Sequence, residues 1–159
     1  MIQRIQSVYL FVSIVVLFVA SFTSSFFYYI TDVAIVNYAG LGITKTTHDH
    51  LHVIENQFLP ICIVTIALAV LGIVVLFSFK NLKKQLRLAQ LFWGLYLMII
   101  IGFVCWYYLV DESSLGGKVI QSNYGISFFL LIIGLGCAQL AFLGIKKDKK
   151  KIESLDRLR

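Results

Sequence analysis

All three histidines of the 159-residue sequence fall within five positions, at His48, His50 and His52. On an extended strand, residues two apart point to the same face, so the three imidazole rings would lie side by side. Imidazole suits zinc, copper or nickel. A metal site needs more ligands in a fixed geometry, however, and Asp49 would point to the opposite face. A polar, solvated loop is the more economical interpretation, so metal binding is kept as a remote alternative and no bound cofactor is expected.

The three cysteines do not form a redox motif. Cys62, Cys105 and Cys137 stand far apart in apolar surroundings, whereas thiol oxidoreductases use closely spaced pairs. A buried cysteine behaves as a small hydrophobic residue. The sequence therefore contains no recognisable set of catalytic residues, and we predict that the protein is not an enzyme.

The elements that must position these residues follow from composition. Hydrophobic residues make up 59% of the chain and charged residues only 14%. Soluble domains have about 45–50% apolar and about 25% charged residues, so this composition indicates an integral membrane protein. The 22 charged residues form five clusters, separated by uncharged segments of 27, 24, 23 and 27 residues at positions 5–31, 56–79, 88–110 and 119–145.

Each uncharged segment is long enough to cross a bilayer once, because about 20 apolar residues of helix span the hydrocarbon core. In lipid the backbone amides must be paired within the segment, which favours helices. The sequence thus predicts one all-α domain, a bundle of four transmembrane helices. The expected spans are 6–30, 58–79, 88–110 and 123–145.

The positively charged residues predict the orientation. Twelve lysines and arginines fall at the N-terminus, in the 80–87 loop and in the 146–159 tail, and only Lys45 and Lys118 fall in the other two loops. The positive-inside rule then places both termini in the cytoplasm and the loops 31–57 and 111–122 in the periplasm. Within the first periplasmic loop, two β-branched segments flank Ala39–Gly42, which predicts a short β-hairpin.

Small residues in the spans predict helix contacts, because they let two backbones approach closely. The candidates are Ser21, Ser25, Gly94, Gly102, Gly134 and Ala138. The spans carry no charged residue, whereas proton relays and ion pathways usually do. If Ser21, Ser24 and Ser25 share one helical face, they could instead line a polar path, and the alternative function is a small oligomeric transporter or channel.

The basic tail and the basic loop are candidate partner-binding segments. They contain Lys83, Lys84, Arg87, Asp156, Arg157 and Arg159. One interpretation is a helix that docks a cytoplasmic protein, and Ile152, Leu155 and Leu158 give it a narrow apolar stripe. The other is an anchor on anionic lipid, to which each basic residue contributes about 1 kcal/mol. Nucleic acid is not the partner we expect.

Three segments carry a resemblance. They are residues 1–7 (MIQRIQS), residues 79–88 (FKNLKKQLRL) and residues 156–159 (DRLR). With the spacing of the four spans, they resemble an uncharacterised family of small integral membrane proteins of Bacteroidota, a domain of unknown function. The resemblance covers the whole chain and implies a bacterial inner-membrane location, and it implies no activity. The three-histidine segment is not part of the pattern.

These observations favour a non-enzymatic accessory or structural subunit of a larger inner-membrane complex. Its expected partners are membrane lipid, other integral membrane proteins and a cytoplasmic protein at the basic tail.

Overall fold

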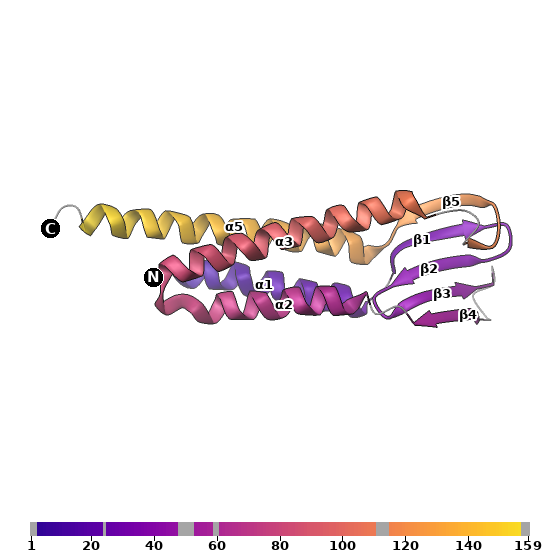
Figure 1. Cartoon of the computed structure of the whole chain (residues 1–159), viewed down its shortest axis with the longest axis horizontal. Coiled ribbons are helices and arrows are strands. Elements are labelled where there is room, and N and C mark those ends of the chain that lie inside the picture. Colours follow the sequence, from indigo (N-terminus) through magenta and orange to yellow (C-terminus); the bar gives the residue numbers. More distant parts are fainter. Residues whose placement is uncertain (1–2, 24, 48–52, 59–60, 111–114, 157–159) are drawn as a thin grey trace.

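The computed structural model describes residues 3–23, 25–47, 53–58, 61–110 and 115–156. Helices lie side by side along the long axis, and a five-stranded antiparallel sheet stands at one end of them (Figure 1). The predicted all-α fold, a bundle of four helices with at most a short β-hairpin beside it, is therefore wrong. The protein has a mixed α/β fold in which the sheet is built from the two segments predicted to be periplasmic loops, together with the ends of the uncharged segments.

The helices are α1 (Gln3–Phe22), α2 (Cys62–Phe77), α3 (Leu82–Leu109) and α5 (Ile126–Asp156), and a 3-10 turn, η1 (Ser78–Lys80), joins α2 to α3. Three of them, α1, α3 and α5, are long and apolar enough to cross a membrane. Helix α2 is also apolar but has only 16 residues. Their length and composition suggest that the protein associates with a membrane.

The strands are β1 (Ser25–Thr31), β2 (Ile35–Ala39), β3 (Gly42–Thr46), β4 (Val53–Phe58) and β5 (Val119–Tyr124). Their order across the sheet is β4-β3-β2-β1-β5. Strand β1 therefore pairs with its sequence neighbour β2 on one side and with the distant β5 on the other. The predicted hairpin around Ala39–Gly42 is present as β2 and β3, within this larger sheet.

The first span differs most from its prediction. The expected helix 6–30 ends at Phe22, and the residues from Ser25 onward form β1. Aromatic and β-branched residues, which favour strands, fill this segment. The fourth span differs in the same way, because its uncharged segment opens with β5 and α5 begins only at Ile126.

The helices pack in a ring in which α1 contacts α2 and α5, and α3 contacts the same two helices. The centre of the ring is filled by buried apolar side chains such as Leu17, Leu68, Phe92 and Leu131. Large apolar side chains also cover the outside of every helix, among them Phe11, Ile63, Met98 and Ile133. An apolar outer surface suits a helix bundle that lipid surrounds.

Aromatic side chains join the sheet to the helices. Phe26 of β1 stacks on Phe103 of α3, with ring centroids 4.5 Å apart. Tyr124 of β5 stacks on Tyr107 of α3 at 4.4 Å. The turn between β2 and β3 also contacts two helices. The Gly40 carbonyl accepts a hydrogen bond from the Cys62 amide, and a Cβ on Gly40 would lie 2.0 Å from the backbone oxygen of Ser21. The sheet is therefore fixed to the bundle.

Candidate functional site

The three-histidine segment lies outside the described residues, and so does Asp49. Among the residues that are described, no group of three or more histidine, cysteine or acidic side chains could hold a metal ion. The cysteines are all free thiols: Cys62 is buried, Cys105 is exposed and Cys137 is half-buried.

Polar side chains inside the bundle bind one another across helices. The Ser13 hydroxyl of α1 donates to the Gly134 carbonyl of α5 at 3.0 Å. The Ser21 hydroxyl of α1 lies 2.6 Å from the hydroxyl of Thr65 on α2, where either group can be the donor. All of these side chains are fully buried. In an apolar setting such bonds fix which helix faces meet.

A third interhelical bond lies at the end of the bundle away from the sheet. The Gln6 side-chain amide of α1 donates to the Asp148 carboxylate of α5 at 2.5 Å, and both side chains are more than 90% buried. A Cβ on Gly144, one turn before Asp148, would lie 2.7 Å from Gln6 Cγ. The glycine therefore makes room for Gln6. Sequence reasoning missed this contact, although Gln6 lies in the first of the segments that carry the family resemblance.

The predicted helix-packing residues divide into two groups. Gly134 and Ala138 are buried where α5 meets its neighbours, and a Cβ on Gly134 would lie 2.1 Å from the Tyr96 hydroxyl oxygen of α3. Gly94 and Gly102 face open space, because no atom of the described residues lies within 4 Å of such a Cβ. The former two make helix contacts within the chain, and the latter two leave small gaps on the outer surface of α3.

Ser21 and Ser25 do not share a helical face. Ser21 lies in the last turn of α1 and is bonded to Thr65, whereas Ser25 is the first residue of β1. Ser24 lies outside the described residues. The polar stripe that motivated the transporter alternative is therefore not formed on α1.

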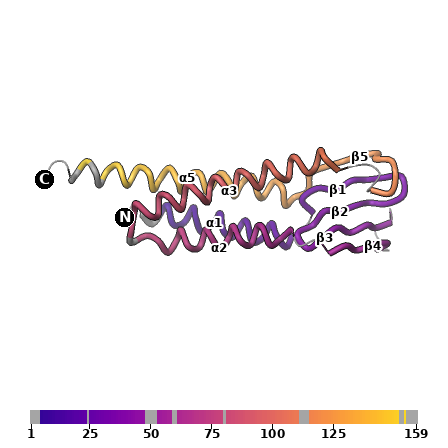
Figure 2. The backbone as a smooth tube through the Cα atoms, in the orientation of Figure 1, coloured from indigo at the N-terminus to yellow at the C-terminus, as the bar shows by residue number. Residues whose placement is uncertain are grey.

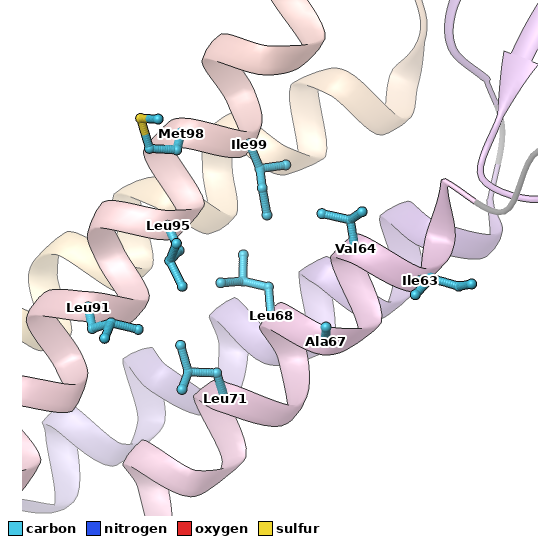
Figure 3. A pocket seen from close by; sticks show the side chains of 9 residues that line it. All are labelled: Ile63, Val64, Ala67, Leu68, Leu71, Leu91, Leu95, Met98 and Ile99. Carbon is cyan, nitrogen blue, oxygen red and sulfur yellow. The ribbon is translucent and has the colours of Figure 1, made fainter.

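A groove of about 600 Å³ opens between α2 and α3 (Figure 3). Side chains of the two helices face one another across it, and all of the lining residues are apolar: Ile63, Val64, Ala67, Leu68, Leu71, Leu91, Leu95, Met98 and Ile99. Ligand pockets usually combine an apolar lining with a few polar groups that orient the ligand. No such group lines this groove.

The basic residues converge at the end of the bundle opposite the sheet. Lys83, Lys84 and Arg87 are exposed near the start of α3. The exposed side chains of Lys146, Lys147, Lys150 and Lys151 belong to the last part of α5, which runs antiparallel to α3 and reaches the same end (Figure 2). The structure thus brings the predicted basic loop and tail together. Asp156 is the last residue of α5, and Arg157 and Arg159 lie outside the described residues.

The sheet end carries several tyrosines and the ion pair between Lys45 and Glu55. The Tyr29 hydroxyl donates to the Tyr107 carbonyl at 2.6 Å, and burial raises the pKa of Tyr29 well above its ordinary value. Burial also raises the pKa of Tyr124 to about 12. Lys45 pairs with Glu55 at 3.0 Å, and hydrogen bonds from Gln57 and Lys45 lower the pKa of that carboxyl. These contacts stabilise the sheet, and among the described residues they bring no nucleophile next to a base.

Comparison with curated proteins finds no match to the sequence. A family model described as a domain of unknown function, DUF4293, matches residues 2–158. The match covers almost the whole chain, and it includes Gln6, Asp148 and the basic residues at the far end of the bundle. The chain therefore belongs to the DUF4293 family.

Proposed function

We propose that the protein is a non-enzymatic accessory or structural subunit of a larger complex in a bacterial inner membrane, in line with the resemblance to a family of Bacteroidota. In this proposal all four helices cross the bilayer. The basic ends lie in the cytoplasm and the sheet lies in the periplasm.

Helix lengths support this placement. The distance along α3 from Arg87 to Tyr108 is about 32 Å at 1.5 Å per residue, and that along α5 from Ile126 to Lys146 is about 30 Å. Helix α2 is about 24 Å long, and η1 extends it by about 6 Å. Each distance matches a hydrocarbon core of about 30 Å. One slab can therefore contain the apolar parts of these helices, with basic residues at one boundary and aromatic residues at the other.

The functional proposal is supported chiefly by the hydrogen bonds that polar side chains form between helices of the bundle. Ser13, Ser21 and Thr65 are engaged in contacts between helices, and the side chains that line the groove between α2 and α3 are all apolar. Intramembrane polar groups that conduct ions or protons face a water-filled cavity or one another along a path. Here they hold helices together, which suits a protein that supports others.

The test is gentle detergent extraction of the tagged full-length protein from its native membrane, followed by affinity purification and mass spectrometry. We expect defined integral membrane partners at constant stoichiometry. An unrelated tagged membrane protein expressed at the same level controls for incidental capture. A solitary monomer under every mild extraction condition would count against the proposal.

A further inference from the structure

The last part of α5 continues past the rest of the bundle. Figure 1 shows α5 extending beyond the start of α1 and the connection between α2 and α3. The helix has 31 residues and runs unbroken from Ile126 to Asp156. At 1.5 Å per residue, Ser154 lies about 12 Å along the axis from Lys146. The headgroup layer on each side of a bilayer is only about 5–7 Å thick.

The Gln6–Asp148 hydrogen bond lies just where α5 leaves the bundle. It ties this point of α5 to the first turns of α1, and Gly144 allows the close approach that the bond requires. Because the contact is buried, α5 is held to α1 up to Asp148 and continues in the same direction beyond it. A segment that lay flat on the membrane would instead have to bend away from the bundle there.

The charge of the extension indicates what it can bind. Lys150 and Lys151 are exposed, whereas Asp148 on the same helix is buried and hydrogen-bonded to Gln6. At physiological ionic strength the Debye length is about 8 Å, so the outer part of the extension interacts weakly with headgroup charge. The sequence there also contains acidic residues, Glu153 and Asp156, among the basic ones. A sequence of mixed charge suits binding to a protein better than binding to a uniformly anionic nucleic acid.

We propose that the last part of α5, from Lys150 onward, is a docking helix for a cytoplasmic protein with an acidic surface, and that the Gln6–Asp148 bond directs it out of the lipid headgroup layer. The inference rests on the proposed function, because this end of the bundle must face the cytoplasm. In this proposal the end of α5 binds a protein, and the basic residues closer to the bundle bind lipid headgroups.

The first experiment measures where the extension lies. Ser154→Cys, in a background with the three native cysteines replaced, is labelled with a fluorophore in the full-length protein in nanodiscs. We expect a water-soluble quencher to reach it equally with phosphatidylcholine alone and with added phosphatidylglycerol. A label at the outward-facing residue Phe129 is the protected control. Protection of Ser154 on addition of the anionic lipid would overturn the proposal in favour of a lipid anchor.

The second experiment measures binding of a fluorescent glutamate-rich helical peptide to the same nanodiscs, beside an oligonucleotide of equal net charge. We expect the peptide to bind more tightly. Lys150→Gln with Lys151→Gln should weaken its binding by about two- to thirtyfold, as for the loss of two exposed ion pairs. Lys118→Gln, at the sheet end, is the control and should leave binding unchanged. Tighter binding of the oligonucleotide, or no effect of the lysine pair, would contradict the proposal.

The hydrogen bond is tested by Gln6→Leu and by the conservative Asp148→Asn. Asp148→Asn keeps a side chain that can bond to Gln6, so peptide binding and quencher access should be retained. Gln6→Leu removes the bond and should weaken peptide binding. Equal binding by a folded Gln6→Leu protein would remove the positioning role. Labelling of Ser154→Cys by an impermeant reagent outside intact cells would refute the cytoplasmic orientation on which the proposed function depends. This result is distinct from a failure of the docking proposal, in which the orientation holds and the peptide does not bind.

Discussion

Adding a methyl group at Gly134 should destabilise the bundle, whereas the same change at Gly94 should not. A Cβ at Gly134 would lie 2.1 Å from the Tyr96 hydroxyl oxygen and 3.2 Å from Val16 Cγ1. Tyr96 is fully buried and its ring packs against Phe92, so it has little room to move. At Gly94 no atom lies within 4 Å of the added carbon.

The magnitude follows from comparing the two substitutions. Alanine favours a helix over glycine by about 1 kcal/mol, and both variants share this gain. Overpacking a tight contact costs about 1–3 kcal/mol, and only Gly134→Ala incurs it. The free energies of unfolding should therefore differ by about 1–3 kcal/mol. For a protein of this size, each kcal/mol changes the melting temperature by about 2–4 °C.

The assay is thermal unfolding of the purified protein in one detergent, followed by circular dichroism. Gly134→Ala should melt about 2–12 °C below Gly94→Ala. Tyr96→Phe removes the atom nearest to the new methyl group, so it should restore part of the lost stability in the double variant. Alone, Tyr96→Phe should cost little, because the hydroxyl oxygen has no hydrogen-bond partner among the described residues. Equal melting of both glycine variants, or strictly additive effects of Gly134→Ala and Tyr96→Phe, would refute the packing argument.

Three further predictions follow from contacts in the bundle and the sheet. A double-mutant cycle of Ser21→Ala and Thr65→Val should give a coupling of about 0.6 kcal/mol in the free energy of unfolding, which is typical of hydrogen bonds between membrane helices. A coupling of zero would show that the bond contributes nothing to stability. Burial raises the pKa of Tyr29 in the folded protein above the value of about 10 that a tyrosine has in the unfolded chain. The buried, protonated Tyr29 therefore contributes fully to stability below about pH 10, and this contribution is lost as the pH rises through the pKa of the folded state. Melting temperature should therefore fall above about pH 10, and the fall should be smaller in Tyr29→Phe. Thr46→Cys in β3 should react with an impermeant thiol reagent outside intact cells while Ser154→Cys does not, and the opposite result would invert the topology.

Much of the helical framework could be predicted from the sequence, because charged residues mark where apolar segments end. The sheet could not, since charge alone does not distinguish an apolar strand from an apolar helix. The lengths of the uncharged segments could have indicated the strands. The uncharged segments at 5–31 and 119–145 have 27 residues each, about seven more than a crossing helix needs, and each excess forms a strand, β1 or β5.

The candidate site was predicted only in part. The fold brings the basic loop and the described basic residues of the tail to one end of the bundle, and a Cβ at Gly134 would meet a neighbouring helix. The bond between Gln6 and Asp148 joins residues 142 positions apart in the sequence. No local sequence motif around either residue indicates that the two are in contact. Gly94 and Gly134 also cannot be distinguished by type or spacing, because only the ring order of the helices decides which glycine faces a neighbour.

The pairing of β1 with β5 makes the sheet depend on the order of synthesis. Tyr29 of β1 pairs with Ser122, so 92 residues must be made between the two partners. At about 5–20 residues per second, translation alone leaves one edge of β1 open for about 5–20 s. That edge belongs to an aromatic segment, Phe26–Phe27–Tyr28–Tyr29, of the kind that pairs readily with foreign strands. A chain stalled before β5 would thus display an unpaired edge of β1, a feature by which quality-control proteases or chaperones could recognise it.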